Sequence, residues 1–151
     1  MKTEAKQAFQ CGFALNESEL RRLHDVLMQQ IKRTAVGDDV HTSYELKFRN
    51  GAVAYPLSVD DVLSQENFGS GSIVRLNMGV SGAGDESANR IRVEFNNVDE
   101  EASVESIKYT IFGDDRDWVF VTSSQIEERI GKLRLFVPNQ LMGRKHRFWC
   151  L

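Results

Sequence analysis

The chain has 151 residues, of which 41% are hydrophobic and 27% charged, and its formal net charge is −3. These values are typical of a single globular domain with its own core, and they exclude a disordered chain, which would be less hydrophobic and more highly charged. The two cysteines, Cys11 and Cys150, have none of the short spacings of metal-binding or redox motifs, so we expect reduced thiols in a cytoplasmic protein.

Two further classes of protein are disfavoured by what the sequence lacks. Residues 1–8 contain no apolar stretch of the kind that forms the centre of a secretory signal, so export is not expected. No run approaches the ~20 consecutive apolar residues that a membrane-spanning helix needs.

Charge is distributed unevenly along the chain. Five basic and no acidic residues lie between 132 and 151, a local net charge of +5, which leaves 14 basic and 22 acidic residues, a net charge of −8, in 1–131. A body this acidic repels a polyanion over most of its surface, so binding to nucleic acid is not expected.

The first predicted elements are a strand and a helix. Apolar residues alternate with polar or small ones from Phe9 to Leu15, which is the pattern of a half-buried strand. Asn16 or Ser18 can cap a helix, and the apolar residues that follow recur every three or four positions. This spacing predicts one buried helical face, formed by Leu20, Leu23, Leu27 and Ile31.

A hairpin and a short helix are predicted next. Apolar and charged residues alternate over 44–48, and Asn50-Gly51 is typical of a tight hairpin turn in which both residues have a positive φ. The return strand is expected over 52–55, because Pro56 cannot continue it, and Ser58 then caps a short helix.

Three more strands are predicted over 72–80, 90–96 and 104–112. Each alternates apolar with polar residues, which favours antiparallel strands with one face in solvent. The whole chain is therefore predicted to be α+β, with a single largely antiparallel sheet of five to six strands, two long helices and one short helix, in the order β-α-β-β-α-β-β-β-α. We expect one domain over 1–136 and a basic-aromatic tail over 137–151.

The carboxylates Asp114, Asp115 and Asp117 have two interpretations. They can open the second long helix, whose positive end favours negative charge, or they can bind a hard cation. The residues that follow lack the glycine and glutamate spacing of a calcium loop, so helix capping is preferred. The β-prone run over 119–122 leaves open a later start for this helix.

No catalytic, cofactor-binding or metal-binding residue is predicted. The glycine-containing stretches 69–72 and 79–84 lack the lysine of a phosphate-binding P-loop and are interpreted as turns. His24 lies inside the first helix and is assigned a structural role, and Trp118 is assigned to the core.

The C-terminal tail is the one candidate binding site. It contains a basic cluster followed at once by aromatic residues, and the residues predicted to bind a partner or a membrane are Arg144, Lys145, Arg147, Phe148 and Trp149. Such a segment can dock on an anionic lipid surface or an acidic partner, or it can mark the cytoplasmic end of a membrane-spanning helix. A last strand or a frayed end is the simpler structural alternative.

From these observations we expect a non-enzymatic interaction or regulatory domain in the cytoplasm, attached through its tail to a protein partner or to the inner face of a membrane. Homodimerisation through an exposed edge strand over 52–55 is a further hypothesis. The alternative function is a small enzyme or ligand-binding protein with a pocket between the sheet and the helices.

Overall fold

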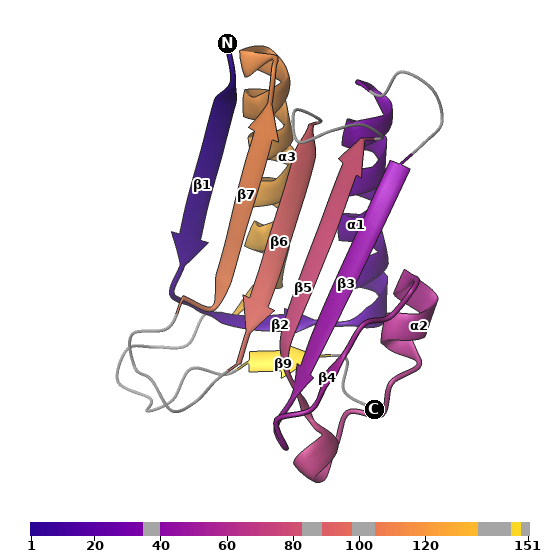
Figure 1. The fold of residues 1–151 in the computed structure, drawn as a ribbon. Coiled ribbons are helices and arrows are strands. Elements are labelled where there is room, and N and C mark those ends of the chain that lie inside the picture. The colour runs from indigo at the N-terminus through magenta and orange to yellow at the C-terminus, as the bar shows by residue number, and fades with distance from the viewer. Residues whose placement is uncertain (35–39, 83–88, 98–104, 136–145, 149–151) are drawn as a thin grey trace.

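An antiparallel sheet with two long helices on one of its faces makes up most of the structure, a computed structural model in which residues 1–34, 40–82, 89–97, 105–135 and 146–148 are described (Figure 1). Within these ranges the sheet has six strands, accompanied by two long helices and one short α-helix. The predicted α+β class and element order are confirmed.

The six strands of the large sheet lie in the order β1-β7-β6-β5-β3-β4, and all neighbours are antiparallel. Their bounds are β1 Thr3–Phe9, β3 Val40–Phe48, β4 Val53–Ala54, β5 Ile73–Gly82, β6 Arg90–Asn96 and β7 Ile107–Gly113. Alternation places one apolar row of each strand on the helix side, where the register aligns Leu46, Leu76, Phe95 and Ile107. The other face of the sheet carries the polar residues and is open to solvent.

Helices α1, Glu17–Lys32, and α3, Arg116–Leu133, cover the apolar face of the sheet (Figure 1). Asn16 is the N-cap of α1, since its side chain accepts a hydrogen bond of 2.8 Å from the Glu19 amide. Asp115 caps α3 in the same way, through the Asp117 amide at 2.9 Å. The predicted helix capping by this cluster is confirmed at Asp115, and α3 begins before the β-prone run because its apolar stripe starts at Trp118.

The hairpin between β3 and β4 closes with a looser turn than Asn50-Gly51 predicted. Gly51 has φ of +89°, whereas no non-glycine residue in the described ranges has a positive φ. Phe48 donates its amide to the Ala52 carbonyl at 2.9 Å, which leaves a three-residue loop with its glycine in the left-handed region. The short helix α2, Val59–Leu63, begins at Ser58 as predicted, because the Ser58 hydroxyl accepts from the Asp61 amide.

The strand predicted from Phe9 to Leu15 is wrong in its extent. Thr3–Phe9 forms β1 at the edge of the large sheet, and Gly12–Leu15 forms a separate strand, β2. Strand β2 pairs antiparallel with β8, Arg134–Leu135, and parallel with β9, His146–Phe148. The alternation of apolar and polar residues does not predict β1, because an edge strand that is largely exposed needs few apolar residues.

The second sheet closes one end of the core, where β2 and β9 cross below the long strands in Figure 1. The Phe13 ring of β2 lies 5.4 Å from the Phe95 ring of β6, measured between centroids. None of the helices in the described ranges combines the length and apolar content required to cross a membrane.

Candidate functional site

The predicted tail residues are divided between strand β9 and the undescribed part of the chain. Arg144, Lys145 and Trp149 lie outside the described residues. Arg147 and Phe148 belong to β9, which pairs with β2 and so joins the fold of the domain. The alternative of a last strand therefore describes residues 146–148.

Phe148 is a core residue and is not a surface docking residue. Its side chain is only 3% exposed, and its ring meets that of Phe13 edge to face at a centroid distance of 5.2 Å. Its carbonyl accepts a hydrogen bond of 3.5 Å from the Asn67 side chain. This burial argues against the prediction that Phe148 binds a partner or a membrane, because a ring packed in the core presents almost no surface to either.

The layer between the sheet and the helices contains apolar residues that are almost completely buried. Polar groups of α1 and α3 bond to one another within it. The Trp118 indole donates to the Gln30 carbonyl at 2.9 Å, and Thr122 donates to the Gln30 side chain at 3.2 Å. This network holds α1 against α3, which is the core role predicted for Trp118.

His24 joins α1 to the sheet. Its Nε2 lies 2.6 Å from the Tyr44 hydroxyl, and the two rings are stacked. Burial lowers the pKa of His24, with a smaller opposing effect from Asp25, and burial likewise raises the pKa of Tyr44. Tyr44 is buried and His24 is partly buried, which agrees with the structural role predicted for His24.

A second buried hydroxyl lies beneath α3. Tyr109 donates to Glu127 at 2.5 Å and lies 2.6 Å from the Ser123 hydroxyl. Burial, helped by the hydrogen bond to the Glu127 carboxylate, raises the pKa of Tyr109 to about 12. A phenol that holds its proton this tightly is suited to fixing α3 on β7 and not to exchanging protons near neutral pH.

The β4 edge, which we define as residues 52–55, lies at the outer margin of the large sheet, as the sequence predicted. Ala54 pairs with Leu46 and Val53 with Lys47, and the Phe48 amide bonds to Ala52. Because outward and inward bonding alternate along a strand, the backbone groups of Val53 and Tyr55 point away from the sheet. In the described ranges no strand pairs with them.

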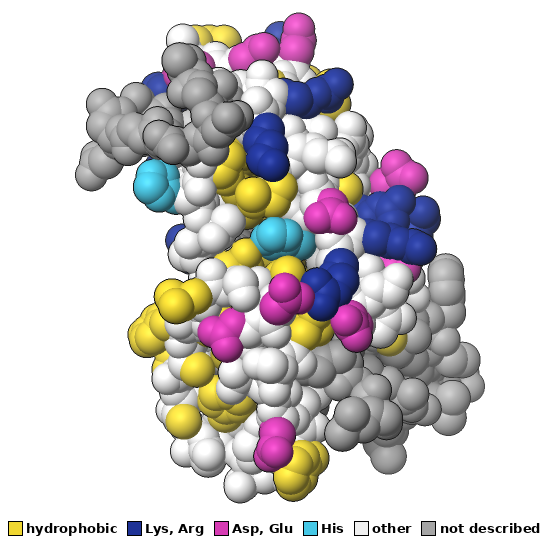
Figure 2. Space-filling view, turned by 90° about the vertical axis from the view of Figure 1, so that its right-hand side faces the viewer, with side chains coloured by type: hydrophobic (Ala, Val, Ile, Leu, Met, Phe, Trp, Pro, Cys, Tyr) yellow, Lys and Arg dark blue, Asp and Glu magenta, His cyan; other side chains and the backbone are white. Residues whose placement is uncertain are grey.

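Exposed apolar side chains lie on this edge and in the chain segment that follows it. Figure 2 shows the side of the molecule on which hydrophobic side chains gather toward one end. Four large apolar residues of segment 53–68 are exposed, and we call them the apolar surface: Val53 (44%), Tyr55 (71%), Leu57 (89%) and Phe68 (65%). Single exposed apolar residues are common on protein surfaces, but four large ones within 16 residues of sequence are characteristic of an interaction surface.

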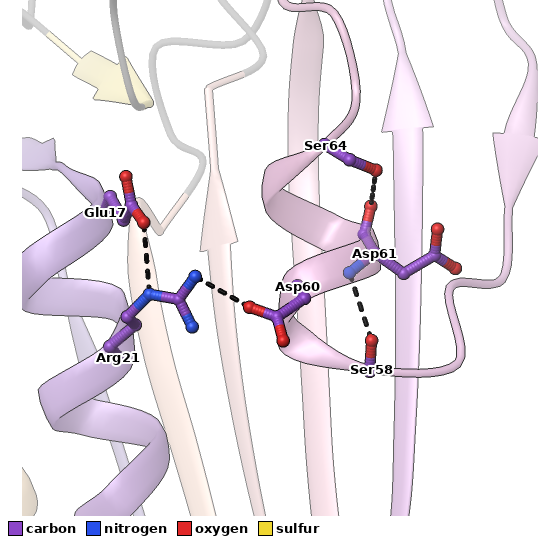
Figure 3. A network of polar contacts seen from close by, with 6 residues as sticks. All are labelled: Glu17, Arg21, Ser58, Asp60, Asp61 and Ser64. Carbon is purple, nitrogen blue, oxygen red and sulfur yellow. Dashed lines mark hydrogen bonds and ion pairs between the residues drawn. The ribbon is translucent and has the colours of Figure 1, made fainter.

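Polar contacts of α2 hold this surface in place (Figure 3). Arg21 of α1 bonds Glu17 through Nε at 3.1 Å and Asp60 of α2 through Nη2 at 2.7 Å. The Leu57 amide donates to the Asp61 carboxylate at 3.0 Å. The segment that carries Tyr55 and Leu57 is therefore anchored at both ends, by β4 and by α2.

The opposite edge of the sheet is protected in a way that the β4 edge is not. Strand β1 carries Lys6 among its exposed residues, and Lys2 precedes it and pairs with Asp114. Charged side chains, lysine above all, discourage another strand from adding to an edge. Residues 52–55 contain no charge, and Pro56 limits how far an added strand could extend.

Comparisons with protein-family models, with curated proteins and with solved structures found no match for this chain. The functional argument therefore depends on the surfaces described above and on their chemistry.

Proposed function

We propose that the chain is a non-enzymatic interaction domain that pairs with a second copy of itself through the β4 edge. The observation that supports this most directly is that the edge is uncharged, has backbone groups directed outward, and carries two of the four residues of the apolar surface. Such an edge is a template for strand addition, and covering it removes apolar surface from water.

A second copy is the partner that fits this edge by symmetry. Two antiparallel copies of 52–55, related by a two-fold axis at Ala54, would place Val53 of each copy opposite Tyr55 of the other. The outward backbone groups of these residues would then bond across the axis, and an aromatic residue would face a β-branched one, which is a favourable cross-strand pair. The Leu57 and Phe68 side chains would add apolar contact at the margins.

The interface is small, so the proposed dimer is weak. Stable interfaces bury about 800 Å² on each partner. Four partly exposed side chains and one short strand supply less than this, and the dimer should form only as the protein concentration rises.

Sedimentation equilibrium over a range of concentrations tests the proposal. We expect the wild type to shift from monomer to dimer as its concentration rises. Tyr55→Lys should remain monomeric, because pairing of the two edges would bury a lysine charge from each copy in the interface. Phe120→Lys is the matched control, since Phe120 is 48% exposed on α3, away from the edge. A monomeric wild type at every concentration, or equal association by Tyr55→Lys, would contradict the proposal.

The basic residues of the tail support a second part of the proposal, attachment of a cytoplasmic domain to an anionic membrane surface. The supporting observation is the contrast between the net charge of +5 in 132–151 and −8 in the rest of the chain. With Phe148 in the core, Arg144 and Lys145 are the residues on which we base this attachment, each worth about 1 kcal/mol near an anionic surface.

A further inference from the structure

The open face of the sheet is hollowed at its centre, on the side away from both long helices. The hollow encloses about 330 Å³, at the lower end of the range of small-ligand sites, which is about 300–1,000 Å³. Polar and charged side chains of β1, β3, β5, β6 and β7 surround it. It is separate from the β4 edge, since none of residues 52–55 lines it.

One row of directly opposed residues runs across the middle of the hollow. The register pairs Ser43 with Gly79, Gly79 with Arg92, Arg92 with Thr110, and Thr110 with Lys6. Gly79 forms the floor, because it places no side chain on this face. A Cβ at position 79 would lie 2.8 Å from the Ser43 hydroxyl oxygen and 3.7 Å from Nη2 of Arg92, so the guanidinium lies across the space that the glycine leaves.

The positive charge of Arg92 is not matched by a carboxylate in the described residues. Its Nη1 donates to the side-chain oxygen of Asn77 at 3.2 Å, a neutral acceptor that orients the guanidinium without neutralising it. Glu94, the next outward residue of β6, is already shared by Lys108 at 3.1 Å and Arg75 at 3.7 Å. Among the described residues, the bond to Asn77 is the one hydrogen bond of this guanidinium, which has five N–H donors in all.

Two more cations lie beside it. Arg90 stacks on the Phe112 ring, 4.6 Å from its centroid, and no carboxylate of the described residues pairs with it. Lys6 lies 3.4 Å from Glu4, the only acidic residue among the described residues that line the hollow. In this described lining, three cations against one carboxylate leave a formal net charge of +2.

The remaining polar groups are small hydroxyls. Ser43, Ser81 and Thr110 line the hollow from three different strands. Each hydroxyl can donate one hydrogen bond and can rotate to suit an acceptor. The site therefore combines fixed guanidinium groups, an ammonium group and adaptable donors around a glycine floor.

We propose that this hollow binds the phosphate group of a small phosphorylated ligand. A phosphate monoester carries a charge of about −1.5 to −2 near neutral pH and three strong acceptor oxygens, which matches the net +2 and the surplus of donors. A guanidinium also matches phosphate geometry with two parallel hydrogen bonds. The ester group would lie along the open face, where the site imposes no closed wall.

The first test is a titration of the full chain with inorganic phosphate, followed through backbone amide chemical shifts at constant ionic strength and at a concentration where the chain is monomeric. We expect saturable shifts at Ser43, Gly79 and Arg92. Arg92→Gln should weaken binding by about tenfold or more, because a charge-assisted hydrogen bond to the phosphate is lost.

Two further variants separate a site from general attraction to a basic surface. Gly79→Ala keeps every charge but displaces the Ser43 hydroxyl and narrows the floor, so we expect it to weaken binding as well. Arg22→Gln is the matched control, because it removes the same charge from an exposed position on α1. Failure to saturate, or equal weakening by Arg22→Gln and Arg92→Gln, would overturn the proposal.

The phosphate could be carried by a soluble compound or by a lipid headgroup. Vesicles containing phosphatidic acid, compared with inorganic phosphate at the same accessible phosphate concentration, distinguish these sources. Binding to the vesicles that is lost in Arg92→Gln assigns the site to a lipid-borne phosphate, and binding of inorganic phosphate alone assigns it to a soluble ligand. A chain that binds neither has no such site, whether or not it forms the proposed dimer.

Discussion

Phe148→Ala tests whether the C-terminal segment belongs to the core. Phe148 is 3% exposed and packs edge to face on Phe13, which in turn packs on Phe95. Truncation of a buried phenylalanine to alanine costs about 3–5 kcal/mol through lost burial and the cavity left behind. We expect about 3 kcal/mol, at the low end, because β9 is a short segment near the chain end and its local detachment limits the loss.

Urea unfolding followed by tryptophan fluorescence measures this loss. With a slope of about 2 kcal/mol per molar urea, a loss of about 3 kcal/mol lowers the midpoint by roughly 1.5 M. Phe68→Ala is the control, since Phe68 is 65% exposed, and a change within about 0.5 kcal/mol is expected there. Equal small effects of both substitutions would show that Phe148 does not stabilise the core.

Three other predictions concern packing, protonation and the tail. Gly113→Ala should lower the free energy of unfolding by about 1–3 kcal/mol, because a Cβ there would lie 2.8 Å from the Trp118 ring. Gly131→Ala should raise it by about 0.5–1 kcal/mol, because Gly131 lies in a helix and a Cβ there would meet open space. Thermal or urea unfolding measures both changes. Burial lowers the pKa of His24, so the unfolded chain binds a proton at this imidazole more readily than the folded chain does. The urea midpoint should therefore fall as the pH drops below about 6.5, and it should fall less in His24→Gln. Combined substitution of Arg144 and Lys145 by glutamine should reduce flotation with anionic liposomes while leaving β9 in place, and unchanged flotation would count against tail attachment.

Local sequence patterns were sufficient to predict the helices and most strands. The three- and four-residue spacing of apolar residues in 20–31 predicts α1, because residues at this spacing lie on one face of a helix and can be buried together. Asn16, Ser58 and Asp115 mark helix starts because an unpaired backbone amide needs an acceptor nearby in the chain. The β4 edge is also a local inference, since Pro56 ends the strand before it can pair further.

Other features depend on which segments meet in space. The alternation through Phe9–Leu15 cannot show that Gly12–Leu15 joins a second sheet, since its partners β8 and β9 lie more than a hundred residues away. Phe148 illustrates the same point. Its basic and aromatic neighbours in the sequence indicate a surface tail, but its position is decided by pairing with β2 and contact with Phe13.

The central hollow shows why the candidate phosphate site could not be predicted from the sequence. Alternation on β6 assigns Arg90, Arg92 and Glu94 to the solvent face, but it does not show which of these charges has a partner. The register of β6 with β5 and β7 places Gly79 beside Arg92 and places Glu94 opposite Lys108, with which it forms an ion pair. Caps and periodicity act over a few residues, so the elements and their polar faces could be predicted locally. Which of the described charges have partners follows from the folded sheet, because charges pair between strands that are neighbours in the sheet and distant in the chain.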